Sequence, residues 1–283
     1  MPKHDSTTRD ALAFAGTDRV LARIDPSAMP NAPSKKGRLP KHLKTDAARI
    51  AQLQELLWAE STAGGKHRVL LLLQGIDTAG KGGVANHVIG ACGPIGVQYI
   101  AFKRPTKSEL RHDFLWRVRK RVPAPGFIGV FDRSHYEDVL VPLVHDEIEP
   151  HVLEHRYEQI NAFERDLAAH ATTLVKCFLH ISYDTQRDRL LRRLDRPDKR
   201  WKFNEADLDE RKLWPKYQEA YQAMLERTDS TDAPWYVVPS DSKKYRNWAV
   251  AELLRETLEA LDLHYPEPDL DLDALRERLQ PPN

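Results

Sequence analysis

Residues 69–83 combine the features of a strand that leads into a phosphate-binding loop. Five aliphatic residues, 69–73, precede a glycine-rich turn in which Gly75, Gly80 and Lys81 have the spacing G-x4-G-K. This spacing lets successive backbone N–H groups surround a polyanion while the lysine ammonium reaches a terminal phosphate. A helix that begins near Gly82 directs the positive end of its dipole at the same anion. The stretch therefore predicts a phosphate site; the alternative is an ordinary glycine-rich turn between a strand and a helix.

The position after Lys81 departs from the usual pattern, because Gly82 stands where Ser or Thr commonly holds Mg²⁺. A metal ligand must then come from elsewhere, and Asp77 inside the loop is the obvious candidate. Asp132 is a second candidate, since it follows the apolar run 126–131 and so stands at the end of an expected strand. Together Asp77 and Asp132 would hold Mg²⁺, or Mn²⁺ in its place, against phosphate oxygens. The alternative for Asp132 is that it caps a helix or forms a turn.

The residues that follow Asp132 extend this candidate site. Arg133 offers a fork of donors that suits phosphate oxygens. We interpret His135 as a structural residue, because phosphoryl transfer depends on positioning more than on proton chemistry. Glu137 either orients an acceptor or caps the next helix, and the residues alone leave both interpretations open.

Two segments are basic although the chain as a whole is nearly neutral, with 43 Lys and Arg against 42 Asp and Glu. Eight of the 19 residues in 103–121 and eight of the 16 in 187–202 are Lys or Arg. Runs of charge usually form solvated helix faces. Here one run follows the second expected strand. The other follows the fourth expected strand, where kinases with a phosphate loop carry an arginine-bearing lid. Two such clusters suit a longer chain of phosphates than a mononucleotide has.

The elements that would position these residues alternate between strands and helices. Strands are expected at 69–73, 97–102, 126–131, 174–181 and 235–238, and helices at 46–61, 82–93, 106–122, 152–169, 214–225 and 248–261. This alternation implies right-handed crossovers and a parallel sheet that is covered on both faces. We therefore expect an α/β fold: a P-loop kinase-like three-layer α/β/α sandwich with a parallel five-stranded sheet and a helical lid.

Composition bounds the organisation of the chain. Residues 1–45 are polar with five prolines and are expected to form a flexible arm, whose basic stretch 34–38 either reaches a polyanion or is solvated. Residues 46–265 are expected to form the catalytic domain including the lid, and residues 266–283 an acidic tail. The net charge of +1 gives no field that would attract nucleic acid, and no apolar run approaches a membrane span. Cys92 and Cys177 lack metal-ligand spacing and are expected to be buried free thiols in a reducing cytoplasm.

Motifs along about residues 45–265 resemble, in order, those of the family-2 polyphosphate kinases. The resemblance is carried by residues 75–83, 102–106, 112–117 and 131–140, with further matches at 201–203, 213–215 and 233–239. It covers Gly82 as well, since this family lacks the usual hydroxyl at that position. The stretch 133–140 is most similar to the subgroup that accepts both AMP and ADP, and the segment after Asp138 resembles the family's helical lid.

The resemblance implies transfer of a terminal phosphoryl group between inorganic polyphosphate and a nucleotide, with Mg²⁺ as the metal and AMP, ADP and ATP as the nucleotides. The catalytic residues it implies are Asp77, Lys81, Asp132 and Arg133, with Asp77 and Asp132 at the metal. The phosphate-binding residues it implies are Gly75, Ala79, Gly80, Lys81, Gly82, Gly83, Lys103, Arg104, Arg133 and Arg193. The residues expected at the acceptor nucleotide are Asp113, Arg117 and Glu137.

Two other functions compete with this one. An ATP-dependent nucleotide or nucleoside kinase on the same fold would need fewer cations than the two basic segments supply. A non-catalytic phosphate-sensing module would bind phosphate through Lys81 without turnover. The protein is expected to be a cytoplasmic homo-oligomer.

Overall fold

A single sheet of five parallel strands lies at the centre of the computed structural model, which describes residues 7–14, 20–33 and 36–280. The strand order is β2-β3-β1-β4-β5, so β1 lies between β3 and β4. Every residue of β1 except the first is buried, because its aliphatic side chains face helices on both sides. The expected parallel five-stranded sheet is confirmed, with strands β1 (Arg68–Gln74), β2 (Val97–Ala101), β3 (Ile128–Asp132), β4 (Thr172–His180) and β5 (Trp235–Pro239).

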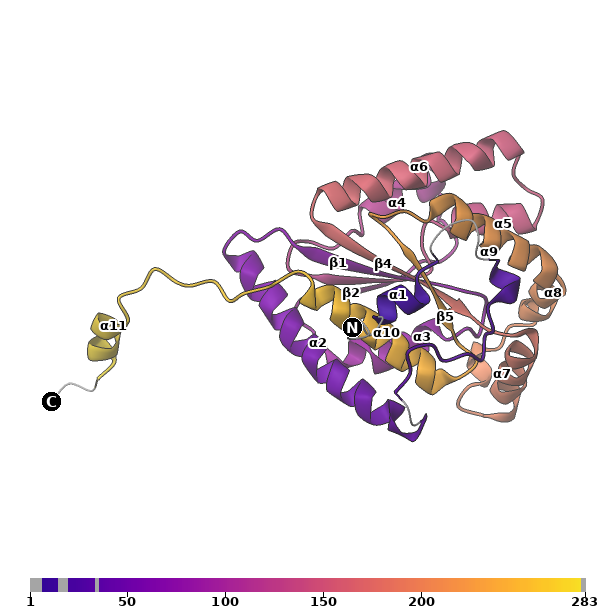
Figure 1. Cartoon of the computed structure of the whole chain (residues 1–283). Coiled ribbons are helices and arrows are strands. Elements are labelled where there is room, and N and C mark those ends of the chain that lie inside the picture. Colours follow the sequence, from indigo (N-terminus) through magenta and orange to yellow (C-terminus); the bar gives the residue numbers. More distant parts are fainter. Residues whose placement is uncertain (1–6, 15–19, 34–35, 281–283) are drawn as a thin grey trace, which may run out of the picture.

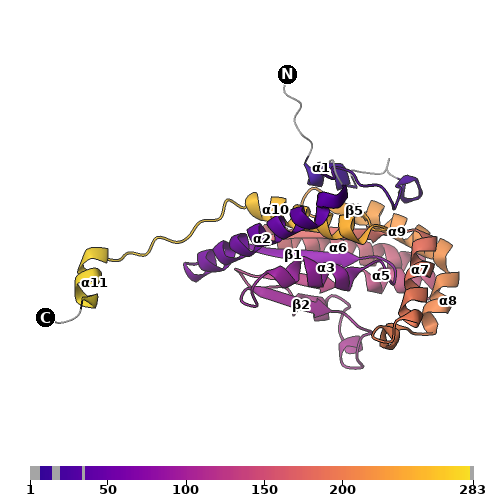
Figure 2. The same ribbon diagram turned by 90° about the horizontal axis from the view of Figure 1, so that it is seen from below.

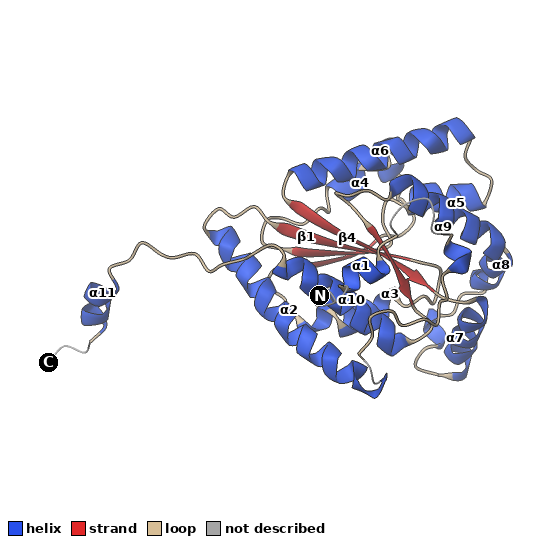
Figure 3. Ribbon diagram, viewed as in Figure 1, coloured by secondary structure: helices blue, strands red, loops and turns tan. Residues whose placement is uncertain are grey.

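Helices cover both faces of the sheet, which gives the expected three-layer α/β/α sandwich (Figures 1 and 3). One layer contains α2 (Leu39–Thr62), α3 (Lys81–His87) and α10 (Lys243–Glu259). The other layer contains α4 (Trp116–Arg119), α5 (Glu137–Val144), α6 (Pro150–Ala169) and α9 (Trp214–Thr228). At the carboxyl ends of the strands stand α7 (Tyr183–Asp195) and α8 (Ala206–Lys212) (Figures 1 and 2).

Short elements complete the described chain. They are α1 (Thr8–Leu12), η1 (Leu21–Arg23), η2 (Lys36–Arg38), η3 (Ile89–Ala91), η4 (Glu109–Arg111), η5 (Arg200–Lys202) and α11 (Leu272–Leu279). The last of these buries none of its residues and lies away from the sandwich in Figures 1 and 2. None of the helices within residues 7–14, 20–33 and 36–280 has the length and apolarity needed to cross a membrane.

The described part of the expected flexible arm packs against the sandwich, which corrects that expectation. Leu12, Phe14 and Leu21 are each at most 2% exposed and belong to the hydrophobic core. The Phe14 N–H donates to the carbonyl of Trp235 at 2.8 Å, which ties the segment to β5. The helix expected from about residue 46 begins earlier, at Leu39, so the expected boundary falls inside α2. Composition suggested an arm because the segment has few apolar residues, yet three of those few are buried in the core.

Parts of the expected arm and tail, namely residues 1–6, 15–19, 34, 35 and 281–283, lie outside the described residues.

The long helix expected at 106–122 does not form. The reciprocal capping hydrogen bonds between Thr106 and Glu109 are present, at 2.7 and 3.3 Å, but only the single turn η4 follows them. The Asp113 carboxylate then accepts from the backbone N–H of Leu115 at 3.1 Å. Such a local side-chain bond competes with the helical backbone bonds, and the next helix, α4, is only four residues long.

A buried ion pair lies between β4 and α6, away from the strand ends. Lys176 Nζ lies 2.7 Å from Glu164 Oε2, and both side chains are at most 2% exposed. His135 is fully buried, with Nε2 3.2 Å from Glu164 Oε1. This burial and this contact are consistent with the interpretation of His135 as a structural residue.

Asp46 in α2 is expected to make stability depend on pH. Its side chain is buried, Oδ2 has no hydrogen-bond partner among the described residues, and Oδ1 lies 3.8 Å from Arg255 Nε. Burial, aided by the neighbouring Glu252 carboxylate, raises the pKa of Asp46 to about 7. A carboxyl whose pKa is raised by folding contributes most to stability below its unfolded pKa of about 4, and that contribution is lost as the pH approaches 7.

Asp46→Asn should remove this dependence. In the parent chain the free energy of unfolding is expected to fall between pH 4 and 7, by about 1–2 kcal/mol from this group after solvent screening is allowed for. Chemical denaturation across this pH range measures the fall. The variant should show a shallower fall and a higher Tm at pH 8; an identical pH profile in both proteins would contradict the assignment.

Candidate active site

The phosphate loop predicted from residues 75–81 joins β1 to α3. Gly75 and Gly80 have φ values of +144° and +115°, which L side chains rarely adopt. A Cβ on Gly75 would also lie 2.7 Å from the carbonyl oxygen of Leu179 in β4. The loop curls around its own lysine: Lys81 is only 8% exposed and its Nζ donates to the Gly75 carbonyl at 2.6 Å. The expected strand, loop, lysine and helix start therefore come together in one turn, with the geometry that a phosphate loop requires.

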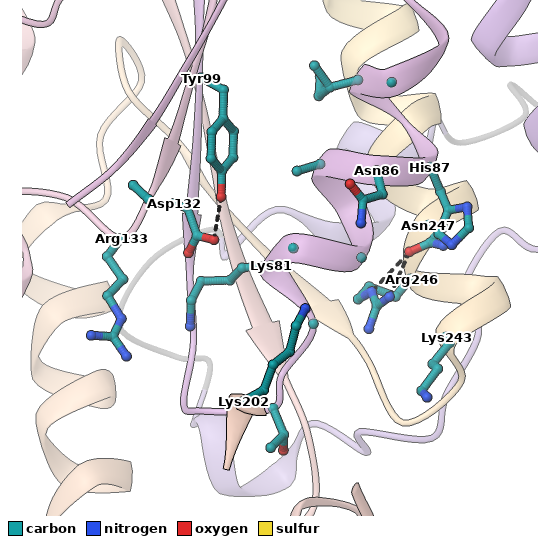
Figure 4. A pocket seen from close by; sticks show the side chains of 18 of the residues that line it. Lys81, Asn86, His87, Tyr99, Asp132, Arg133, Lys202, Lys243, Arg246 and Asn247 are labelled. Carbon is teal, nitrogen blue, oxygen red and sulfur yellow. Dashed lines mark hydrogen bonds between the residues drawn. The ribbon is translucent and has the colours of Figure 1, made fainter. Parts of the chain in front are cut away.

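A large cavity, here called the basic cavity, opens in front of this loop (Figure 4). Its volume is about 1160 Å³, above the roughly 300–1,000 Å³ of typical small-molecule sites. Its lining carries eleven Lys and Arg side chains but only two carboxylates, Asp77 and Asp132. The cations are Lys81, Lys103, Arg133, Arg189, Arg192, Arg193, Arg196, Lys199, Lys202, Lys243 and Arg246. A nearly neutral chain has thus concentrated positive charge in a cavity that suits a polyanion.

Two buried arginines lie behind the loop and give its backbone a positive surrounding. Arg189 of α7 donates to the carbonyls of Thr78 and Ala79 at 2.8 and 3.0 Å, and Arg246 of α10 donates to the Ala79 carbonyl at 3.0 Å. The remaining hydrogen bonds of the two guanidinium groups go to backbone carbonyls and to the Asn247 amide oxygen, so their acceptors are neutral groups. Burial lowers the pKa of both arginines to about 10, which leaves them charged at neutral pH.

Adjacent glycines in the first turn of α3 offer a matched test of this packing. A Cβ at Gly83 would lie 2.5 Å from Arg246 Nη2, whereas a Cβ at Gly82 meets nothing within 4 Å. Gly83→Ala should displace the buried guanidinium and lower the free energy of unfolding by about 1–3 kcal/mol. Gly82→Ala should be neutral or stabilising by up to about 1 kcal/mol, since alanine favours helix. Denaturant unfolding of the ligand-free protein compares the two; equal effects would contradict the contact.

The two predicted metal carboxylates face the basic cavity from neighbouring strand ends. The Asp77 carboxylate accepts from Arg133 Nη2 at 2.8 Å. Burial opposes ionisation of Asp77, but Lys81, Arg133 and Arg193 outweigh it and hold its pKa below the usual value. Asp132 Oδ2 accepts a hydrogen bond from the Tyr99 hydroxyl at 2.8 Å (Figure 4). Burial, and to a lesser extent this hydrogen bond, raise the pKa of Tyr99.

Arg133 has an uncommon backbone conformation for a residue with a side chain, with φ at +63°. Burial alone would lower the pKa of its guanidinium, but Glu137 and Asp77 raise it above the usual value. The strand-end turn thus aims a permanently charged group at Asp77, and strained residues of this kind often occur at functional sites.

A smaller cavity, here called the acidic cavity, lies on the other side of Asp77 and Arg133. Its volume is about 50 Å³, and both of these residues line it as well as the basic cavity. Its other lining residues are acidic, aromatic or uncharged: Gly75, Ile76, Glu137, Leu140, Val141, Gln186, Asp207, Glu210, Tyr217 and Tyr221. Burial and the charge of Asp77 raise the pKa of the Asp207 carboxyl. The Asp77–Arg133 pair therefore stands between two cavities of opposite electrostatic character.

The structure gathers most of the phosphate residues expected from the sequence. Gly80, Lys81, Gly82 and Gly83 line the basic cavity, together with Lys103, Arg133 and Arg193. Gly75 lines the acidic cavity. Ala79 is fully buried, and its carbonyl accepts hydrogen bonds from Arg189 and Arg246. Arg104 is exposed and lines neither cavity.

Of the residues expected at the acceptor, Glu137 alone lines one of the two cavities described above. Asp113 forms an exposed ion pair with Arg119 at 2.8 Å. The buried Arg117 guanidinium donates to the Lys103 carbonyl at 2.7 Å and to Asp138 at 3.2 Å. Arg117 thus holds the backbone of a cavity-lining lysine, and neither Asp113 nor Arg117 lines the basic or the acidic cavity.

The segment after Asp138, which the sequence predicts as a helical lid, packs into the core instead. That segment forms α5 and α6, whose Leu140, Val144 and Ile160 are buried in the core. The two cavities are instead lined from the strand-end side by α7, η5 and α8, and the basic segment 187–202 lies in α7, η5 and the loop between them. The apolar face of α5 explains the difference, because such a face must pack against other apolar groups.

Several lining residues were missed by the sequence analysis: Tyr99, Lys243, Arg246 and Asn247. A signal existed for the last three, since α10 opens directly after β5 with Lys243 and Lys244 in its first turn. Cations at a helix N-terminus oppose the helix dipole, so their presence indicates an anion nearby. Tyr99 gave no such signal, because a tyrosine in a strand is an ordinary strand residue.

Comparison with known proteins adds independent findings. Residues 34–266 match the family model described as polyphosphate kinase 2. The chain is 49% identical over 221 residues to the AMP/ADP-polyphosphate phosphotransferase of Meiothermus ruber, covering 78% of this chain and 81% of that protein. It is 44% identical over 237 residues to the ADP-polyphosphate phosphotransferase of Rhodopseudomonas palustris, covering 80% and 81%. A crystal structure of polyphosphate kinase 2 from Arthrobacter aurescens TC1 superposes with a TM-score of 0.94 at 46% identity, over 96% of both chains.

Proposed function

The chain belongs to the polyphosphate kinase 2 family, and we propose that it transfers a terminal phosphoryl group between inorganic polyphosphate and AMP or ADP. The observation that carries this proposal is the position of Asp77 and Arg133, which line both the basic and the acidic cavity. A polyanionic donor in the first cavity and a nucleotide acceptor in the second would meet at this pair. An ATP-dependent kinase would not need a cavity with eleven cations, and the relatives' names favour polyphosphate as well.

In the proposed reaction, an oxygen of the acceptor's terminal phosphate attacks the terminal phosphorus of polyphosphate. A new P–O bond forms to the acceptor as the P–O bond to the penultimate phosphate breaks, so the polymer loses one phosphate. AMP then becomes ADP, or ADP becomes ATP, and the reverse reaction extends the polymer. Little proton chemistry is required, because the reacting groups are phosphate anions.

Charge stabilisation at the transferred group is the main task of the chain's own residues. Lys81 and the N–H groups of the α3 first turn would hold the terminal phosphate, and Arg133 would contact the oxygens that carry charge in the transition state. The buried Arg189 and Arg246 fix the loop backbone from behind, so the donors are positioned before the substrate arrives. Lys103 and Arg193 would neutralise the following phosphates.

Mg²⁺ fits the carboxylates of this site. Asp77 and Asp132 line one cavity with Lys81, each offers hard oxygen donors, and the Thr78 hydroxyl oxygen is buried without a hydrogen-bond partner among the described residues. No cluster of three or more His, Cys, Asp or Glu that could hold a metal occurs within residues 7–14, 20–33 and 36–280. Asp77 and Asp132 would therefore share the ion with substrate phosphates, as is usual for Mg²⁺. When bound, it neutralises charge on the phosphate oxygens.

The acceptor is proposed to bind in the acidic cavity. Glu137, one of the three residues expected at the acceptor from the sequence, lines this cavity. Carboxylates accept hydrogen bonds from ribose hydroxyls or an exocyclic amine, and Tyr217 and Tyr221 offer aromatic surface to a base. The present volume of about 50 Å³ is too small for a nucleoside. Binding would then require α8, which contributes Asp207 and Glu210, to move away from α9.

The decisive experiment combines the purified protein with Mg²⁺, polyphosphate and AMP and then separates the nucleotides. Formation of ADP and ATP, dependent on both polyphosphate and Mg²⁺, is the expected result. Turnover of AMP with ATP but not with polyphosphate would favour the alternative kinase. Absence of ADP and ATP, with ADP also inert as an acceptor, would overturn the proposal.

The expected homo-oligomer and the cytoplasmic location stay predictions, which sedimentation velocity and cell fractionation test.

A further inference from the structure

One side chain of the edge strand β2 reaches the predicted metal site. β2 stands at the end of the strand order and pairs with β3. In the register of these two strands, Tyr99 lies opposite Val130, and Ala101 lies opposite Asp132. Alternate residues of a strand share a face of the sheet, so Tyr99 and Asp132 are diagonal neighbours on one face. An aromatic side chain is long enough to bridge such a diagonal.

The Tyr99 hydroxyl is the donor that holds the Asp132 side chain. It donates to Oδ2 at 2.8 Å, and the two side chains point toward each other in Figure 4. Among residues 7–14, 20–33 and 36–280, no other group donates to the Asp132 carboxylate, and no cation forms an ion pair with it. The second oxygen, Oδ1, is therefore available to a bound ion.

This donor orients Asp132 without cancelling its charge. Asp77, the other predicted metal carboxylate, accepts instead from the Arg133 guanidinium at 2.8 Å, so a permanent cation compensates it. A tyrosine hydroxyl is uncharged at neutral pH, since its ordinary pKa is about 10. Of the two carboxylates, Asp132 is thus the one whose negative charge no ion pair compensates.

The backbone around this contact is fixed as well, whereas the tyrosine ring is only partly packed. The Phe102 N–H donates to the Asp132 carbonyl at 3.0 Å, and the Phe102 ring meets Phe131 edge-on, with the ring centroids 4.9 Å apart. Tyr99 itself is 45% exposed and lines the basic cavity. A half-exposed ring gains less from apolar burial than a buried one, so core packing alone does not require a tyrosine at this position.

We propose that Tyr99 is a positioning residue for the metal, whose hydroxyl holds the Asp132 carboxylate in the orientation that binds Mg²⁺ beside the substrate phosphates. Hydrogen bonds from groups outside the ligand shell orient metal-binding carboxylates, and their removal typically costs about 10–100-fold in metal affinity or activity. The inference rests on the proposed function, which assigns Asp132 to the ion, and adds to it a residue that acts through this carboxylate.

Tyr99→Phe tests the inference, because phenylalanine keeps the ring and removes only the hydroxyl. Tyr265→Phe is the control, since Tyr265 is 58% exposed and lines neither the basic nor the acidic cavity. Binding of Mn²⁺ to the substrate-free protein is measured from the paramagnetic resonance signal of the free ion. Tyr99→Phe should weaken Mn²⁺ binding about tenfold and raise the Mg²⁺ concentration for half-maximal rate by a similar factor. Its KM for ADP and its Tm should stay close to the parent values, as should every value of the control.

A double-mutant cycle with Asp132→Asn separates positioning from a purely structural role. If Tyr99 acts through Asp132, the double variant should bind Mn²⁺ no more weakly than Asp132→Asn alone, because the charge that the hydroxyl orients is already absent. Losses that multiply in the double variant, or Mn²⁺ binding by Tyr99→Phe equal to that of the parent, would overturn the inference. If the parent transfers phosphate to neither AMP nor ADP, the proposed function fails instead, and the Mn²⁺ cycle still decides the role of Tyr99.

Discussion

Lys81→Met is expected to abolish most phosphoryl transfer while leaving the fold intact. The ammonium of Lys81 is the cation that the loop surrounds, and its removal takes away a charge placed at the transferred phosphate. Losses of this kind cost at least about 10³-fold in kcat, because the charge acts on the group that carries negative charge in the transition state. Steady-state rates with ADP and polyphosphate measure the effect. The stability change should be about 1 kcal/mol, since Lys81 makes one hydrogen bond, to the Gly75 carbonyl.

The matched control is Lys44→Met, at an exposed position of α2 that lines neither the basic nor the acidic cavity. This variant should keep the parent kcat and Tm. A Lys81→Met protein that retains kcat within tenfold would contradict the role of the loop. A protein that binds polyphosphate through Lys81, but shows no turnover in the parent form, would point to the phosphate-sensing alternative.

Asp132→Asn is expected to lower kcat by about 10²–10⁴-fold and to raise the Mg²⁺ concentration needed for half-maximal rate. Asparagine keeps the shape of the side chain and an oxygen that can accept from the Tyr99 hydroxyl, so the local geometry should persist. What is lost is the negative charge that would hold a divalent cation next to phosphate oxygens. Titration of Mg²⁺ at saturating substrates separates the metal effect from a general loss of activity.

Asp166→Asn serves as its control, since Asp166 is an exposed residue of α6 that pairs with His170 at 3.3 Å and lines neither cavity. It should leave both kcat and the Mg²⁺ dependence unchanged. An Asp132→Asn enzyme with a normal Mg²⁺ dependence would remove Asp132 from the metal site and leave Asp77 as the remaining carboxylate.

Cations were placed correctly from the sequence where they follow a strand or the loop directly. Lys81, Lys103 and Arg133 all occupy the basic cavity, because the carboxyl ends of parallel strands share one edge of the sheet. Arg193 also lines the basic cavity. It was predicted from the family resemblance and from its position in the basic segment after β4. Asp113 and Arg117 line neither the basic nor the acidic cavity, and the helix expected to carry them is interrupted at Asp113.

The sequence by itself determined the sheet, the phosphate loop and the strand-end position of Asp132, since each depends on short-range features: aliphatic runs, glycine spacing and residues at strand ends. The family followed from the resemblance of its motifs. Only the tertiary structure decided which cations surround the loop. Arg246 lies 166 residues after Gly80 in the chain, yet a Cβ on Gly80 would come within 1.7 Å of its Nη1. The same holds for the N-terminal segment, whose Phe14 is buried against β5. Such contacts arise because packing of helices on the sheet brings distant residues together, and no local pattern encodes which helix lies next to which loop.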